Sequence, residues 1–131
     1  MLSHTADTGI IAYGENLPEA FGNAAYGLFS IITDLRKVRQ SETRTIEVSG
    51  ADWDSLLFDW LNQLIYVFDV EHLLFKSCEV TELTETHLTA ICRGERYDPS
   101  RHQLKIGVKS ATYHMLKVDR EENRAQVIFD I

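Results

Sequence analysis

The sequence predicts an α+β fold of two layers, in which two amphipathic helices pack on a mixed, largely antiparallel sheet. Two segments of the first half repeat apolar residues at steps of three and four, which is the spacing of one helix face. Most of the second half alternates apolar with polar residues between short polar turns, as antiparallel hairpins do. The chain has 131 residues, 44% of them hydrophobic, and no Pro/Gly/Ser-rich linker, so we expect a single domain over residues 1–131.

The first predicted helix begins at Asn16 and ends near Thr33. Asn16 can cap the helix, Pro18 suits its first turn, and the Glu19 carboxylate can reach back in a capping box. The apolar face that follows consists of Phe21, Ala24, Ala25, Leu28, Phe29 and Ile32.

The second predicted helix covers residues 52–69 and has the clearest helical period in the chain. It follows a predicted strand, residues 43–49, that has one side in the core and ends at Gly50. The acidic residues Asp52 and Asp54 suit the positive end of the helix dipole. The apolar stripe of this helix consists of Trp53, Leu56, Leu57, Trp60, Leu61, Leu64, Ile65 and Phe68.

The second half of the chain is predicted to be mostly strand. Tight turns at residues 84–85 and 121–123 favour antiparallel hairpins. A charged loop within residues 93–102 has Asp98-Pro99 as a turn starter, and we expect it to be exposed. The predicted strands are residues 76–83, 86–96, 105–109, 112–119 and 125–129.

Composition excludes several classes of function. The 13 Lys and Arg residues against 20 Asp and Glu residues give a formal net charge of −7, and the basic residues are scattered, which disfavours direct nucleic-acid binding. Cys78 and Cys92 lack C-x-x-C spacing, which argues against a zinc site or a disulfide framework. No apolar run reaches the roughly 18 residues that cross a bilayer, and the first residues do not resemble a signal peptide, so we expect a cytoplasmic protein with no membrane contact.

Carboxylates at the two ends of the chain are the first candidates for a binding site. Residues 4–9 place His4, Asp7 and two hydroxyls beside a glycine, and Asp130 precedes the α-carboxylate of Ile131. If the last strand pairs beside the first, these oxygens converge, and a cation would neutralise them. Oxygen donors favour calcium, magnesium or manganese over zinc. The alternative is that Asp7 only bonds local backbone in a turn and the terminal carboxylate is solvated.

Other polar residues have weaker claims to a function. Asp59 borders the apolar stripe of the second helix and either lies on the helix surface or meets a basic group of a partner. Lys109 and His114 lie near a strand junction, where His114 could equally sit at the rim of the core. No Walker loop, G-x-S-x-G or H-E-x-x-H motif is present, so motifs give little support for an enzyme.

Five motifs in order resemble the archease family. They are H-T-A-D-T-G at residues 4–9, the L-L-x-x-W-L-x-x-L-I-Y helix at 56–66, Y-D-P-x-R-H at 97–102, K-x-x-T-Y-H at 109–114 and the final F-D-I at 129–131. Each motif alone is unspecific, but together they span nearly the whole chain. Ser110 departs from the alanine that is more usual there.

The resemblance implies an accessory protein that is not itself an enzyme. Archeases act with the RtcB-type RNA ligase in tRNA splicing and RNA repair, where they promote its guanylylation and its repeated turnover, so RNA is reached only through the ligase. By motif position, Asp7, Asp130 and the carboxylate of Ile131 are the family's ligands for a divalent cation, often calcium, and Lys109 helps the ligase. The family also has chaperone-like roles and modulates a tRNA methyltransferase.

Three alternatives remain from the sequence. One is a stand-alone metal-dependent phosphoester hydrolase that uses His4, Asp7 and His114 around one cation. Another is a chaperone-like modulator of a tRNA-modifying enzyme. A third is a general RNA-binding module, which the net charge of −7 disfavours.

Overall fold

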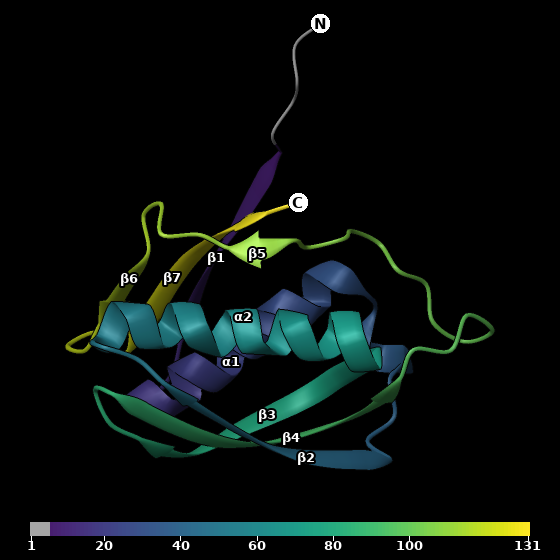
Figure 1. The fold of residues 1–131 in the computed structure, drawn as a ribbon, viewed down its shortest axis with the longest axis horizontal. Helices are drawn as coiled ribbons and strands as arrows, with labels where there is room; N and C mark the ends of the chain where they lie inside the picture. The colour runs from purple at the N-terminus through teal and green to yellow at the C-terminus, as the bar shows by residue number, and fades with distance from the viewer. Residues whose placement is uncertain (1–5) are drawn as a thin grey trace, which may run out of the picture.

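The computed structural model describes residues 6–131 (Figure 1). Within them lie two α-helices, α1 (Leu17–Ile32) and α2 (Trp53–Glu71), and a short 3₁₀ helix, η1 (Leu35–Lys37). The strands of this part of the chain are β1 (Asp7–Tyr13), β2 (Glu42–Ser49), β3 (Leu73–Leu83), β4 (His87–Arg96), β5 (Ser110–Ala111), β6 (Lys117–Asp119) and β7 (Arg124–Asp130).

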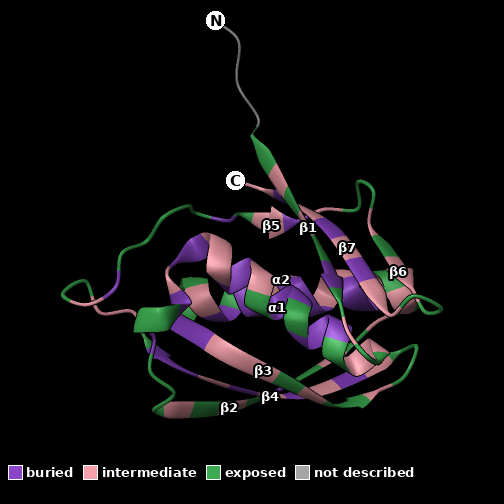
Figure 2. Cartoon of the chain, turned by 180° about the vertical axis from the view of Figure 1, so that it is seen from behind, coloured by how far each residue is buried: buried purple, intermediate pink, exposed green. Residues whose placement is uncertain are grey.

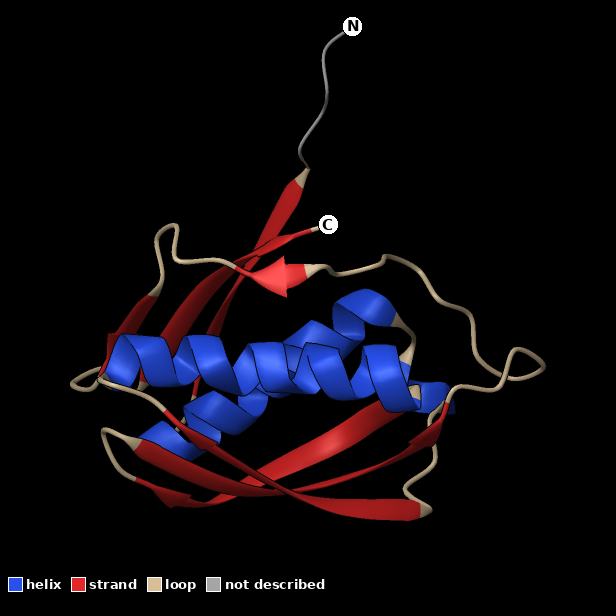
Figure 3. Ribbon diagram, in the orientation of Figure 1, coloured by secondary structure: helices blue, strands red, loops and turns tan. Residues whose placement is uncertain are grey.

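The strands form two separate antiparallel sheets with the helices between them (Figures 1 and 3). One sheet has the order β1-β7-β5, with β6 also paired to β7, and the other has the order β2-β4-β3. Helix α1 contacts β3 of one sheet and β1 and β7 of the other. The predicted α+β fold with two helices packed on antiparallel strands is confirmed, with the strands divided between two sheets where one was expected.

Two glycines of α1 let both sheets approach the helix closely. A Cβ added at Gly22 would lie 2.6 Å from the carbonyl oxygen of Cys78 on β3. A Cβ added at Gly27 would lie 2.9 Å from Cδ1 of Ile10 on β1. The helix is therefore buried on two sides, whereas the sequence pattern showed only its main apolar face.

The predicted ends of α1 agree with the observed ones, whereas α2 continues past its predicted end at residue 69 to Glu71. The Asn16 side chain accepts a hydrogen bond from the Glu19 N–H (2.9 Å), and Thr33 caps the other end of α1. The Glu19 carboxylate accepts from the N–H of Glu15 (3.2 Å), one residue before the cap. Helix α2 begins with a capping box between Asp52 and Ser55.

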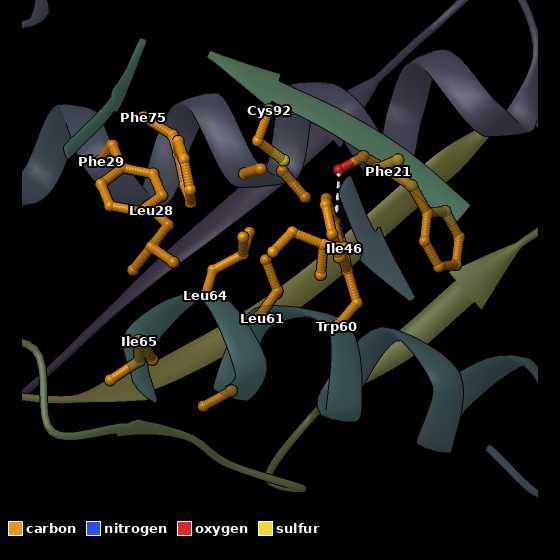
Figure 4. Packing of buried hydrophobic residues seen from close by; sticks show 14 of the residues in the cluster. Phe21, Leu28, Phe29, Ile46, Trp60, Leu61, Leu64, Ile65, Phe75 and Cys92 are labelled. Atoms are coloured by element: carbon orange, nitrogen blue, oxygen red, sulfur yellow. Dashed lines mark hydrogen bonds between the residues drawn. The ribbon is translucent and has the colours of Figure 1, made fainter. Parts of the chain in front are cut away.

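The apolar stripe of α2 forms the centre of the core (Figure 4). Trp60, Leu61 and Leu64 are fully buried, and the Trp60 Nε1–H donates to the carbonyl oxygen of Phe21 on α1 (3.0 Å). This bond satisfies the indole N–H inside the core, as a buried tryptophan requires. Figure 2 shows that more exposed residues alternate with more buried ones along strands of both sheets, as expected for sheets that cover the core with one face.

Two predicted strands are wrong. Residues 105–109 pair with no strand in the described part of the chain, although the Lys105 N–H donates to the carbonyl oxygen of Ile32 (2.7 Å). Of residues 112–119, only Lys117–Asp119 form a strand, because a turn intervenes in which Met115 has a φ of 54°. In the first of these segments, Val108 is buried, whereas Ile106 is exposed. Among the described residues, no helix has both the length and the apolar character needed to span a membrane.

Candidate functional site

The first and last strands lie side by side, which brings the carboxylates of the two chain ends together (Figure 1). In the antiparallel register, Asp7 lies directly opposite Asp130. Residues directly opposite each other point to the same face of a sheet, with Cβ atoms about 4.5–5.5 Å apart. The pairing on which the predicted site depends is therefore present.

The position of the last residue is held by contacts. The Ile131 N–H donates to the carbonyl oxygen of Ala6 (3.2 Å), and the Ile131 side chain packs against the core. The backbone of Ile131 is therefore held in place, and its α-carboxylate lies next to Asp130 in the chain. This contact weakens the alternative in which the terminal group is merely solvated.

The two aspartates repel each other when both are ionised. Asp7 is exposed and Asp130 is half-buried, and like charges directly across a strand pair destabilise a sheet. A bound cation would relieve this repulsion. Carboxylate oxygens suit calcium, magnesium or manganese, so the donor set fits the class of cation expected from the sequence.

The described side chains alone do not complete a coordination shell. Within residues 6–131, no group of three or more His, Cys, Asp and Glu side chains could hold a metal ion. Asp7, Asp130 and the carboxylate of Ile131 together carry six oxygens, which reach the lower end of the six to eight that calcium takes only if every carboxylate binds through both of its oxygens. The remaining positions would be open to water, a nucleotide or another protein.

Lys109 lies beside this pair. Its N–H donates to the carbonyl oxygen of Asp130 (2.8 Å), and the residue is exposed. The next residue, Ser110, lies opposite Asp130 in the β5–β7 pairing. Strand β5 is held to α2 by the Asn62 Oδ1, which accepts from the Ala111 N–H (2.8 Å). Sequence reasoning missed Asn62, since its partner lies 49 residues further along the chain.

Of the other predicted residues, His114 and Asp59 do not join the carboxylate pair. His114 is exposed in the turn between β5 and β6, beside Tyr113, which stacks on Phe58 with ring centroids 4.0 Å apart. His114 is therefore neither on a strand nor at the rim of the core. Asp59 lines a groove between α2 and β2, where burial raises the pKa of its carboxyl. His4 lies outside the described residues.

The charged loop before β5 is more buried than predicted. His102 is only 4% exposed, and the Glu95 carboxylate that it contacts is also buried. The sequence offered no sign of this, because the partners of Glu95 come from two separate segments of the chain. The loop is thereby fixed to the end of β4.

Comparisons with known proteins all point to one family. Residues 1–131 match the Archease protein family. A protein archease of Pyrococcus abyssi is 42% identical over 134 residues, covering 98% of this chain and 94% of that protein. The solution structure of Methanobacterium thermoautotrophicum protein 1598 is 37% identical, with a TM-score of 0.79, and covers 99% of this chain and 96% of that one. The crystal structure of an archease and possible chaperone from Thermotoga maritima shares the fold, with a TM-score of 0.67 at 16% identity, covering 100% and 95% of the two chains.

Proposed function

The chain belongs to the archease family, and on that premise we propose that it is an accessory protein of an RtcB-type RNA ligase rather than an enzyme. It would promote guanylylation of the ligase and repeated turnover in tRNA splicing and RNA repair. The observation that supports this proposal is the opposed pair Asp7 and Asp130, which places an exposed and a half-buried carboxylate next to each other at the end of a sheet.

The residues of this chain would act by presenting oxygen donors to the partner. Asp7 and Asp130 project from the same face of a sheet that β7 anchors in the core through Phe129, which is fully buried. A divalent cation held there would stabilise the charge that develops during nucleotidyl transfer. We propose calcium for this cation, with magnesium or manganese as the alternatives. The rigid strands would orient the carboxylates, and the open positions would admit a group of the ligase or its nucleotide.

Lys109 would contribute a positive charge next to the carboxylates. Its backbone is fixed by the bond to Asp130, and the residue is exposed. An ammonium group there suits a phosphate oxygen of the nucleotide or an acidic side chain of the ligase. We propose it as a supporting residue, whereas Asp59 and His114 lie outside the carboxylate pair.

Replacing either aspartate by asparagine tests the proposal. We expect Asp7→Asn and Asp130→Asn each to abolish stimulation of ligase guanylylation, because each removes a ligand charge with little change in shape. Folding should persist, since the substitutions relieve repulsion. The measurement is the time course of covalent guanylate on the ligase with GTP and a divalent metal.

The matched control is Asp69→Asn, which removes one negative charge from an exposed position of α2. It should stimulate guanylylation as the unaltered protein does. Full stimulation by Asp7→Asn or Asp130→Asn would contradict the proposal. Metal-dependent hydrolysis of phosphate esters without the ligase, lost on His4→Ala, would instead favour the hydrolase.

A further inference from the structure

A basic groove lies far from the carboxylate pair, between the segment after α1 and the start of β3. It has a volume of about 600 Å³, within the range of pockets that hold ligands. Its basic lining consists of Arg36, Lys37, Arg39, Lys76 and Arg101, which are five of the 13 Lys and Arg residues of the chain. Basic residues that are scattered along the sequence are therefore gathered in the fold at this place.

One wall of the groove is fixed by a short helical turn. The Asp34 carboxylate caps η1, accepting from the Arg36 N–H (3.1 Å) and from its guanidinium (2.9 Å). Val38 is buried at 2% exposure, and the Arg39 N–H donates to the Glu95 carboxylate (2.6 Å). With the backbone held at both points, the exposed residues Lys37 and Arg39 line the groove.

The opposite wall is fixed by an irregularity in β3. Pairing shifts between Phe75 and Ser77, so Lys76 is an extra residue without a partner on β4. Such a bulge turns a side chain away from the direction that regular alternation would give it. The Ser77 hydroxyl donates to the Gln40 Oε1 (2.7 Å), which ties the two walls together.

Charge pairing leaves a surplus of positive charge in the groove. Arg36 pairs with Asp34, and Arg101 pairs with Glu95 and Asp98. Within residues 6–131, by contrast, no ion pair involves the three remaining cations, which are Lys37, Arg39 and Lys76. Salt at about 0.1 M screens charges beyond roughly 10 Å, so most of the chain's excess acid acts weakly here.

The lining also indicates how a ligand would be recognised. None of the residues lining the groove is aromatic, so nucleobases have no ring on which to stack. Long cationic side chains match phosphate oxygens, and several of them in one groove suit a chain of phosphates.

We propose that this groove binds consecutive phosphodiester groups of a single nucleic-acid strand, without regard to base sequence. The binding is independent of the carboxylate pair and of any ligase. Figure 1 shows β3 on the lower side of the molecule and β5 and the end of β7 on the upper side, so the two sites do not overlap. Affinity would lie in the range of non-specific sites, about 10⁻⁴ to 10⁻⁶ M.

The test measures fluorescence anisotropy of a labelled RNA strand of roughly ten nucleotides, with chelator and no ligase, at about 20 to 200 mM salt. Each phosphate that a protein cation neutralises on a single strand contributes about −0.7 to the slope of log affinity against log salt concentration. Three such contacts, one for each unpaired cation of the groove, predict a slope of about −2. Lys37→Gln and Lys76→Gln should each reduce that slope by about 0.7 and weaken binding about fivefold at 0.1 M salt. The control Lys117→Gln, which removes the same charge on β6, should change neither by as much.

Equal binding of a DNA strand of the same sequence would support recognition of the phosphodiester backbone. Equal binding of polyglutamate with the same charge would overturn the phosphate assignment and favour an acidic protein. If Lys117→Gln weakened binding as much as Lys37→Gln and Lys76→Gln, or if no RNA bound at low salt, the proposal that the groove binds RNA would be overturned. Thermal unfolding of each variant checks the fold, since neither lysine side chain makes a hydrogen bond or ion pair within residues 6–131.

Discussion

At the residue scale, Glu95 explains how a charged loop is fixed to the core. The Glu95 carboxylate accepts hydrogen bonds from the Arg101 guanidinium, the Arg39 N–H and the His102 ring. The Asp98 N–H donates to the His102 Nδ1 (2.9 Å), so the ring proton lies on Nε2 and points to Glu95 (3.0 Å). The Arg101 side chain, followed by these other donors, lowers the pKa of the Glu95 carboxyl to about 2.

The low pKa of Glu95 predicts a dependence of stability on pH. The pKa of this carboxyl in the folded protein, about 2, lies below the ordinary value of 4.5. The ionised carboxylate therefore contributes fully to the free energy of unfolding above about pH 4.5, and this contribution is lost as the pH falls towards 2. That contribution is on the order of 3 kcal/mol. Glu95→Gln should therefore be less stable at neutral pH and lose less stability than the unaltered protein on acidification.

Urea unfolding at several pH values between about 7 and 3 measures this dependence. The matched control is Glu79→Gln, which changes an exposed glutamate and should keep the acid dependence of the unaltered protein. If Glu95→Gln and the unaltered protein lost stability in parallel, Glu95 would not be the group that titrates.

At the element scale, the tightest packing at any glycine of the chain is between β3 and β4. A Cβ added at Gly94 on β4 would lie 1.8 Å from the carbonyl oxygen of Leu74 on β3. No rotation of a side chain can relieve this contact, because both groups belong to the backbone. The approach precedes the bulge that places Lys76 in the basic groove, so one irregular stretch of β3 serves both packing and the groove.

Gly94→Ala should therefore destabilise the protein by about 3 kcal/mol or more, at or beyond the upper end of ordinary overpacking. The chain contains its own control, because a Cβ added at Gly107 would meet nothing within 4 Å. Gly107→Ala should be close to neutral or slightly stabilising. Chemical denaturation of the two variants compares them, and equal losses would show that the β3–β4 contact is not tight in solution.

At the scale of the whole molecule, the two ends of the chain close one sheet. Strand β7 pairs with β1 on one side and with β5 and β6 on the other, and α1 packs on both β1 and β7. A ligand that joins Asp7 to Asp130 therefore bridges the first and last strands. The basic groove lies beside β3 of the other sheet.

Calcium should consequently raise the thermal stability of the protein. A cation that binds only the folded state stabilises it by about 2.7 kcal/mol at a concentration a hundred times its dissociation constant. Asp7→Asn should lose this effect, whereas Asp69→Asn should keep it. Thermal unfolding in calcium and in chelator at equal ionic strength measures the difference, and an equal rise for both variants would place the cation elsewhere.

Local patterns in the sequence determined the helices, their caps and most of the strands. Asn16 caps α1 as predicted, because capping and helical periods depend on residues three or four positions apart. Asp52, predicted only as an acidic residue that suits the helix dipole, is the N-cap of α2. The archease resemblance, supported by the family match, gave the candidate carboxylates by motif. Residues 105–109 were predicted wrongly because alternation alone does not supply a partner strand.

Only the tertiary structure decided which distant segments meet. From the sequence, the carboxylates were expected to meet only if the first and last strands paired. The structure shows that β1 pairs with β7 in a register that places Asp7 opposite Asp130, at the other end of the chain. The tertiary structure also divides the strands between two sheets and brings Lys37, Lys76 and Arg101 together in one groove. Such contacts depend on how whole elements pack, and no local spacing of residues encodes that packing.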